Sequence, residues 1–125
     1  MEPKPVNTEK ATQPVGPYSQ ACIAGSTIYV SGQLPATPSG EIVEGSIGDM
    51  TRACCENIKF VLEGCGSSLS KIVKVNVYLT SMQNFPAMNE VYGTYFVHKP
   101  ARSTVAVKEL PKGVPVEIEC IALTG

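Results

Sequence analysis

The 125-residue chain has no tryptophan, a single histidine and no long apolar run. A membrane-spanning helix needs about 18 or more consecutive apolar residues, so we expect no membrane partner. Lysine and arginine number 10 against 11 aspartates and glutamates, which gives a net charge of −1. Because nucleic-acid binding draws on clustered positive charge, this balance argues against nucleic acid as a partner.

Metal-binding and cofactor-binding signatures are also missing. The cysteines are odd in number, and none has a CxxC or Cys/His ligand spacing. No phosphate loop, GxGxxG or GxSxG occurs. The sequence therefore predicts no metal and no cofactor. Buried, reduced thiols, which are typical of cytosolic proteins, are expected at Cys22, Cys54, Cys55, Cys65 and Cys120.

The N-terminus has no apolar segment of the kind that secretory signals carry. Glu2 and the absence of a nearby arginine argue against a mitochondrial presequence. We therefore expect a cytoplasmic protein, with mitochondria and the nucleus as open alternatives. Residues 1–13 are polar and proline-spaced, so we expect a loose arm at the start of a single domain that spans residues 1–125.

Hydrophobic periodicity predicts two helices. Apolar residues between 46 and 65 recur at spacings of three and four, with Arg52 and Glu56 on the opposite face. Asn84-Phe85-Pro86 is typical of a helix start with proline in the first turn. A second apolar stripe follows, and we expect Pro100 to end that helix.

Strands are predicted on both sides of these helices. Period-2 alternation and turn residues mark segments 21–24, 27–30, 73–79, 102–107 and 114–123. The expected order is β-β-α-β-α-β-β. This order favours an α+β fold with one mixed sheet and both helices on one face.

The sheet is predicted to be apolar on both faces. On the last strand, Val114 to Ala122 alternate toward one face, whereas Ile121 and Leu123 point toward the other. Two helices cover only one face, and a small domain does not leave a whole apolar face in water. We therefore expect an obligate oligomer.

Arg102 begins a predicted strand, and Glu117 and Glu119 share one face of the next strand along the chain. An arginine fork binds a carboxylate through two parallel hydrogen bonds, and a glutamate can orient water as a general acid or base. Two interpretations stay open: a carboxylate-binding site, or an ordinary surface salt bridge between these residues. Tyr18, Ser31 and Gly32 could each face a ligand, although their surroundings equally suit simple turns.

Several segments together resemble the RidA/YjgF family of reactive-intermediate (enamine/imine) deaminases. The resemblance covers residues 10–124, and its C-terminal signature is the most specific part. The matching segments are Gly16-Pro17-Tyr18-Ser19-Gln20-Ala21, Ser31-Gly32-Gln33, Asn57-Ile58, Val73-Lys74-Val75-Asn76-Val77-Tyr78, Asn89-Glu90-Val91-Tyr92, Pro100-Ala101-Arg102-Ser103, Leu110-Pro111-Lys112-Gly113 and Val116-Glu117-Ile118-Glu119.

The resemblance implies a chorismate-mutase-like α+β fold and a homotrimer whose sheets form a central barrel, with active sites between subunits. It also implies hydrolysis of 2-aminoacrylate, 2-iminobutyrate and similar imino or enamino acids to 2-oxo acids and ammonia. Arg102 would bind the substrate carboxylate, and Glu117 would position the water. The remaining cleft residues would be Tyr18, Ser31, Gly32, Asn89 and Thr104. Thr104 departs from the family pattern, because many members carry a cysteine there.

Two other functions compete with the deaminase. The same cleft could bind 2-oxo acids or other small carboxylates without turnover, although retention of both Arg102 and Glu117 favours an enzyme. An RNA-directed activity, as a translation inhibitor or ribonuclease, is described for the family. The sequence gives this activity little support, because it has neither a basic patch nor a histidine pair.

Overall fold

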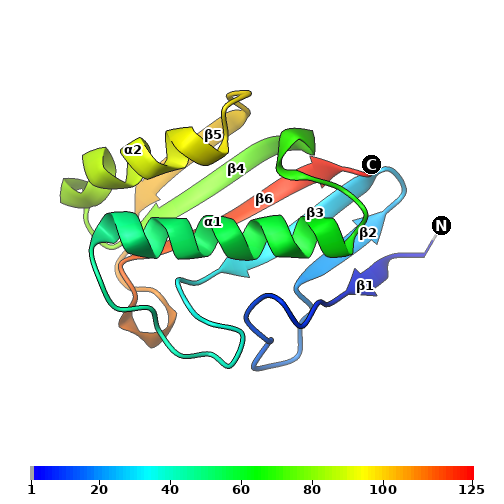
Figure 1. Cartoon of the computed structure of the whole chain (residues 1–125), viewed down its shortest axis with the longest axis horizontal. Coiled ribbons are helices and arrows are strands. Elements are labelled where there is room, and N and C mark those ends of the chain that lie inside the picture. The colour runs from blue at the N-terminus through cyan, green and yellow to red at the C-terminus, as the bar shows by residue number, and fades with distance from the viewer. Residues whose placement is uncertain (1) are drawn as a thin grey trace.

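The computed structural model describes residues 2–125, which form one mixed sheet with two α-helices. The strands are β1 (Lys4–Val6), β2 (Ala21–Ala24), β3 (Thr27–Gln33), β4 (Ile72–Leu79), β5 (Ala101–Ala106) and β6 (Val116–Leu123). Their order across the sheet is β1-β2-β3-β6-β4-β5 (Figure 1). Only β4 and β5 are parallel, and the other neighbours pair antiparallel. The predicted α+β fold with a mixed sheet is confirmed.

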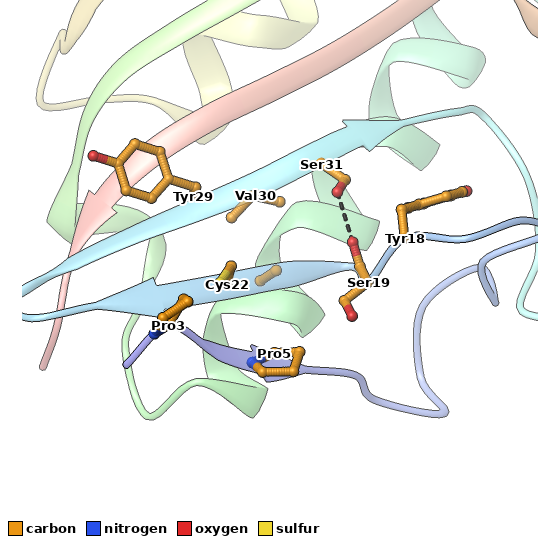
Figure 2. Close-up of a pocket in the computed structure, with 9 residues that line it drawn as sticks. Pro3, Pro5, Tyr18, Ser19, Cys22, Tyr29, Val30 and Ser31 are labelled. Carbon is orange, nitrogen blue, oxygen red and sulfur yellow. Dashed lines mark hydrogen bonds between the residues drawn. The ribbon is translucent and has the colours of Figure 1, made fainter. Parts of the chain in front are cut away.

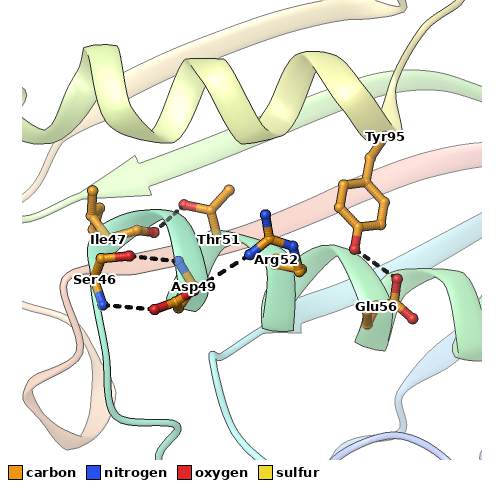
Figure 3. Close-up of polar contacts among 7 residues, drawn as sticks. All are labelled: Ser46, Ile47, Asp49, Thr51, Arg52, Glu56 and Tyr95. Atoms are coloured by element: carbon orange, nitrogen blue, oxygen red, sulfur yellow. Dashed lines mark hydrogen bonds and ion pairs between the residues drawn. The ribbon is translucent and has the colours of Figure 1, made fainter.

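Helices α1 (Ile47–Gly64) and α2 (Phe85–Tyr95) lie side by side on the same face of the sheet (Figure 1). A capping box begins α1: the Ser46 hydroxyl accepts from the Asp49 N–H, and the Asp49 carboxylate accepts from the Ser46 N–H (Figure 3). The Tyr95 hydroxyl donates to Glu56 at 2.7 Å and joins the two helices. Three short 3₁₀ turns occur at Leu69–Lys71, Met82–Asn84 and Pro111–Gly113.

The hydrophobic core lies between the helices and one face of the sheet. Alternate residues of β4 and β6 point into it and are buried, and Cys54, Ile58 and Val61 of α1 pack on them. The strand residues in this layer are Val75, Val77, Leu79, Val116, Ile118, Cys120 and Ala122. Burial of this apolar layer drives the pairing of the strands and helices.

No helix covers the opposite face of the sheet within residues 2–125. Large apolar side chains there stay in solvent: Tyr29 is 50% exposed, Val105 47%, Leu123 45% and Val73 43%. We call this the open face. Its apolar character agrees with the alternation that the sequence predicted for the last strand.

The expectation of a loose arm over residues 1–13 is wrong for the described part of it. Residues 4–6 form β1 and pair with β2 at the edge of the sheet. The buried Gln20 side chain anchors the next stretch, since it accepts from the Thr8 N–H and donates to the carbonyls of Thr8 and Thr12. An edge position also tolerates Pro5, because proline has no N–H for a further strand.

Two further expectations need correction. The additional strand changes the order to β-β-β-α-β-α-β-β. Helix α2 ends at Tyr95 rather than at Pro100, because Phe96 leaves helical dihedrals (φ −105, ψ 60) and buries its ring against Tyr92. Lys99 then adopts a positive φ of 55 and turns the chain into β5.

Candidate functional site

Arg102 lies at the start of β5 and points toward the helices. It pairs in register with Val75, which is fully buried under them, and paired residues share a face. Its Nη1 donates to Asn89 Oδ1 at 2.6 Å. Its guanidinium carbon lies 4.6 Å from the ring centre of Tyr92 and 5.4 Å from that of Phe85.

Glu117 lies on β6 and points to the open face. It pairs with Tyr78, whereas its neighbours Val116 and Ile118 enter the core. The interpretation of these two residues as a surface salt bridge is therefore wrong within one chain. Strand β4 separates β5 from β6, so two strand spacings of about 4.8 Å each and the thickness of the sheet lie between them. Because β5 and β6 follow one another in the sequence, the sequence had suggested that they are neighbours in the sheet. Instead, β4 pairs with both strands and lies between them.

Glu117 borders a pocket of about 450 Å³ that includes three other predicted site residues. The pocket residues are Val15, Tyr18, Ser31, Gly32, Leu34, Pro111, Lys112 and Glu117. Tyr18 is 52% exposed. The Ser31 hydroxyl donates to the Ser19 carbonyl at 2.6 Å, which joins the end of β3 to the segment after Tyr18 (Figure 2).

Gly32 lets the Glu117 carboxylate lie against the backbone of β3. A Cβ added at Gly32 would lie 2.7 Å from Glu117 Oε2 and 2.8 Å from its Cδ, so a side chain here would displace the carboxylate. The glycine therefore permits the observed position of the carboxylate through close approach rather than through special backbone dihedrals. We call Tyr18, Ser31, Gly32 and Glu117 the glutamate half-site.

The electrostatic surroundings of Glu117 favour its protonated form. Burial raises the pKa of the Glu117 carboxyl, and the nearby charge of Glu119 raises it further. Glu119 itself is held by two donors, because Asn76 Nδ2 and the Tyr78 hydroxyl both reach its Oε2, at 3.0 and 3.1 Å. Glu119 is thus a fixed carboxylate beside Glu117 on the same face of β6.

Arg102, Asn89 and Thr104 form a second group, which we call the arginine half-site. Thr104 follows Arg102 by two residues on the same face of β5, and its buried Oγ1 has no hydrogen-bond partner within residues 2–125. Arg102 and Asn89 border a pocket of about 430 Å³. No carboxylate pairs with Arg102 in the described chain, where the single ion pair joins Arg52 to Asp49.

The sequence-predicted site residues therefore fall into two half-sites on opposite faces of the sheet. Sequence reasoning missed two aromatic neighbours of Arg102, Phe85 and Tyr92. Their spacing offered a signal, since Phe85, Asn89 and Tyr92 stand at i, i+4 and i+7 and so share one helical face. The sequence predicted no role in the site for either ring.

Four of the cysteines have thiols whose pKa is raised. Burial raises the pKa of Cys55 to about 12, and burial also raises the pKa values of Cys54, Cys65 and Cys120. His98 Nε2 lies 2.9 Å from the Ile72 carbonyl. Within residues 2–125, no three histidine, cysteine, aspartate or glutamate side chains gather closely enough to hold a metal ion. Neither α1 nor α2 combines the length and apolarity of a transmembrane helix.

Comparison with known proteins decides the family. The model of the endoribonuclease L-PSP family matches residues 8–124, nearly the whole chain. The chain belongs to this family. The resemblance to RidA/YjgF proteins that the sequence indicated is therefore confirmed.

Members of the L-PSP family with differing names are similar to the chain. The mitochondrial protein mmf1 of Schizosaccharomyces pombe is 50% identical over 123 residues, which are 95% of this chain and 75% of the relative. A 2-iminobutanoate/2-iminopropanoate deaminase of Dermatophagoides farinae is 44% identical over 126 residues, covering 98% of each chain. The crystal structure of Escherichia coli TdcF with bound serine matches with a TM-score of 0.92 and 38% identity, covering 98% of this chain and 99% of that one.

Proposed function

We propose that this protein hydrolyses reactive 2-imino and 2-enamino acids, such as 2-iminobutyrate and 2-aminoacrylate, to 2-oxo acids and ammonia. We further propose a homotrimer in which the arginine half-site of one subunit faces the glutamate half-site of its neighbour. The observation that carries the proposal is the separation of Arg102, which has no carboxylate partner in the described chain, from Glu117 on the opposite face.

The open face supports association with further copies of the chain. Tyr29, Val105 and Leu123 are large apolar side chains on three different strands, each close to half exposed. A symmetric assembly would cover them and would bring residues from two subunits to one cleft. The open face also includes Glu117, so the glutamate half-site would border the interface.

The chemistry needs orientation and proton transfer. Arg102 would bind the substrate carboxylate through two parallel hydrogen bonds, next to an imino carbon that is already electrophilic. Glu117 would take a proton from water as the water oxygen bonds to that carbon, and would pass this proton to the imino nitrogen to give the carbinolamine. Glu117 would then take the proton of the new hydroxyl and deliver it to the nitrogen as the C–N bond breaks, leaving a 2-oxo acid and ammonia.

Two relatives support this assignment. The Dermatophagoides farinae relative is named as a deaminase of the proposed substrates. The TdcF structure holds serine, which has a carboxylate beside a nitrogen-bearing carbon, as the proposed substrates do. The raised pKa of Glu117 suits a group that must both accept and donate a proton.

Subunit complementation tests the composite site. Arg102→Ala and Glu117→Ala should each inactivate the enzyme, measured as release of 2-oxobutyrate when the protein is coupled to a threonine dehydratase. When the two variants are co-assembled in equal amounts, about a quarter of the clefts between subunits would receive both intact residues. We expect about a quarter of wild-type activity in the mixture. No recovery in verified mixed trimers would contradict the inter-subunit site, and a wild-type protein without activity would contradict the deaminase.

Binding without turnover is the first competing function. It needs Arg102 but not Glu117, so it predicts tight 2-oxobutyrate binding together with no hydrolysis in the wild type. An RNA-directed activity is favoured by the family description and by the names of similar solved structures, but the net charge of −1 gives it no electrostatic support. RNA degradation that co-purifies with the protein and disappears in Arg102→Ala would favour it.

We propose the cytoplasm as the compartment, since the chain carries five free cysteines. The mitochondrial name of the Schizosaccharomyces pombe relative makes mitochondria the competing location. Fractionation of the native host, with immunodetection of the untagged protein, would separate these two locations.

A further inference from the structure

One face of α2 presents three side chains to Arg102. Phe85, Asn89 and Tyr92 recur at spacings of four and three, so they lie in a row along the helix. Arg102 lies at the start of the strand that follows, in contact with all three. The three side chains that contact Arg102 therefore all come from one helix, α2.

The aromatic contacts of Arg102 are close enough to fix its orientation. A cation within about 6 Å of a ring centre is attracted to the face of the ring, and the distances here are 4.6 Å to Tyr92 and 5.4 Å to Phe85. Tyr92 cannot easily move, because it is only 7% exposed and its ring packs on Phe96 with 4.4 Å between centres. The ring is thus a rigid support for the guanidinium.

Asn89 fixes the rotation of the guanidinium within its own plane, which contact with the rings leaves free. Its Oδ1 accepts one Nη1 hydrogen at 2.6 Å, while the aromatic rings occupy the face of the guanidinium. A guanidinium has five N–H donors in one plane. In Arg102, one N–H donor is bound to Asn89 and the face of the guanidinium is covered by the rings. The remaining N–H donors lie along the edge of the guanidinium, which needs little reorganisation before it binds a planar carboxylate.

We infer that Phe85 and Tyr92 are positioning residues that hold the guanidinium of Arg102 in its carboxylate-binding orientation. This inference rests on the proposed function of Arg102. In this arrangement each aromatic residue acts through the arginine. The Tyr92 hydroxyl has no part in it, since it is buried without a hydrogen-bond partner in the described chain. The ring alone therefore carries the effect.

Three variants of the full-length protein separate the ring from the hydroxyl. Tyr92→Leu removes the ring, Tyr92→Phe keeps it, and Phe85→Leu removes the second, less buried ring. We expect Tyr92→Leu to weaken 2-oxobutyrate binding by about tenfold, as loss of a desolvated cation–π contact predicts. Tyr92→Phe should bind like the wild type, and Phe85→Leu should show a smaller loss. Titration calorimetry measures the dissociation constants.

Tyr95→Leu is the matched control. Tyr95 lies one turn after Tyr92, and its hydroxyl bonds to Glu56 on α1 (Figure 3). The rings that contact Arg102 are those of Phe85 and Tyr92. This variant undergoes the same substitution on the same helix and should keep wild-type affinity. Equal losses in Tyr95→Leu and Tyr92→Leu would mean that helix damage, rather than the support of Arg102, weakens binding, and would overturn the inference.

Proton NMR of the ligand-free proteins gives a readout that does not depend on catalysis. The Arg102 side-chain protons should be shifted upfield by the Tyr92 ring in the wild type and in Tyr92→Phe, and should lose that shift in Tyr92→Leu. Lost shift with unchanged 2-oxobutyrate affinity would refute the positioning role while leaving the proposed function intact. A wild type that shows the shift but binds no 2-oxo acid would instead refute the proposed function, and with it the role of the two rings in carboxylate binding.

Discussion

Gly32→Ala should impair catalysis through Glu117 while leaving the fold intact. The new methyl carbon would lie 2.7 Å from Glu117 Oε2, and an ordinary contact begins at about 3.4 Å, so the carboxylate must move by about 0.7 Å. The clash involves the far end of a flexible side chain, and Gly32 does not have a positive φ. The backbone therefore accepts alanine, and the strain is relieved almost entirely by displacement of the carboxylate.

The displacement should appear in turnover. Misplacement of a reacting group by about 1 Å costs on the order of 100-fold in rate, so a shift of about 0.7 Å predicts a loss of roughly 10-fold to 100-fold in kcat. The threonine dehydratase coupled assay measures kcat, and chemical denaturation monitored by circular dichroism measures the free energy of unfolding. We expect that free energy to change by less than about 1 kcal/mol.

A double-mutant comparison shows whether the effect runs through Glu117. In a Glu117→Gln background, adding Gly32→Ala should cause little further loss, because the group that it displaces no longer transfers a proton. The reasoning is refuted if Gly32→Ala keeps wild-type kcat, since Glu117 would then not need its observed position. Additive losses in the double variant would also refute it, because they would mean that Gly32 acts on something other than Glu117.

Four further predictions concern the arginine, the carboxylate pair and the fold. Arg102→Lys should lower kcat/KM by roughly 10-fold to 100-fold, because a point charge replaces neither the forked contact nor the stacking on Tyr92; steady-state kinetics that match the wild type would contradict this. Glu119→Gln should move the acidic limb of the kcat/KM profile to lower pH, since the Glu119 charge raises the pKa of Glu117; an unmoved limb would mean that Glu119 does not act on Glu117. Because the pKa of Glu117 is raised in the folded state, its carboxyl contributes stability that is fully present below the unfolded-state pKa of glutamate and is lost as pH rises through the folded-state pKa. Glu117→Gln should therefore gain stability relative to wild type as pH rises across that window. Urea titrations at several pH values measure this difference in the free energy of unfolding. Ser46→Ala should lower the free energy of unfolding by about 1 kcal/mol through loss of the α1 capping box, also measured in urea.

Local patterns predicted the regular elements well because each element carries its own signal. The helix expected over 46–65 spans Ile47–Gly64, and the strand expected over 73–79 spans Ile72–Leu79. The strand β1 was missed because its three residues contain Pro5, which sequence reasoning treats as a breaker. Non-local contacts order the N-terminal segment, among them the pairing of β1 with β2 and the hydrogen bonds of Gln20 to residues 8 and 12.

The arrangement of the candidate site residues could not be predicted from the sequence. The sequence singled out Arg102 and Glu117, and the interpretation of the two as a salt bridge assumed that consecutive strands are neighbours. Which strands become neighbours depends on non-local pairing, here the insertion of β4 between β5 and β6. No pattern within residues 101–123 carries that information. The division of these residues into two half-sites on opposite faces followed only from the sheet order and register.

Register is what keeps the arginine and the glutamate apart. Arg102 pairs with Val75 and Glu117 with Tyr78, residues of opposite parity on the same strand β4, and the two side chains therefore leave opposite faces. A slip of β5 by one residue would turn Arg102 to the open face, toward Glu117 and Glu119, where it could form an ion pair within the chain. The same slip would turn Arg102 away from Tyr92 and Asn89. The observed register thus denies Arg102 a carboxylate of its own subunit and gives it aromatic support instead, which is the arrangement that a substrate-binding arginine requires.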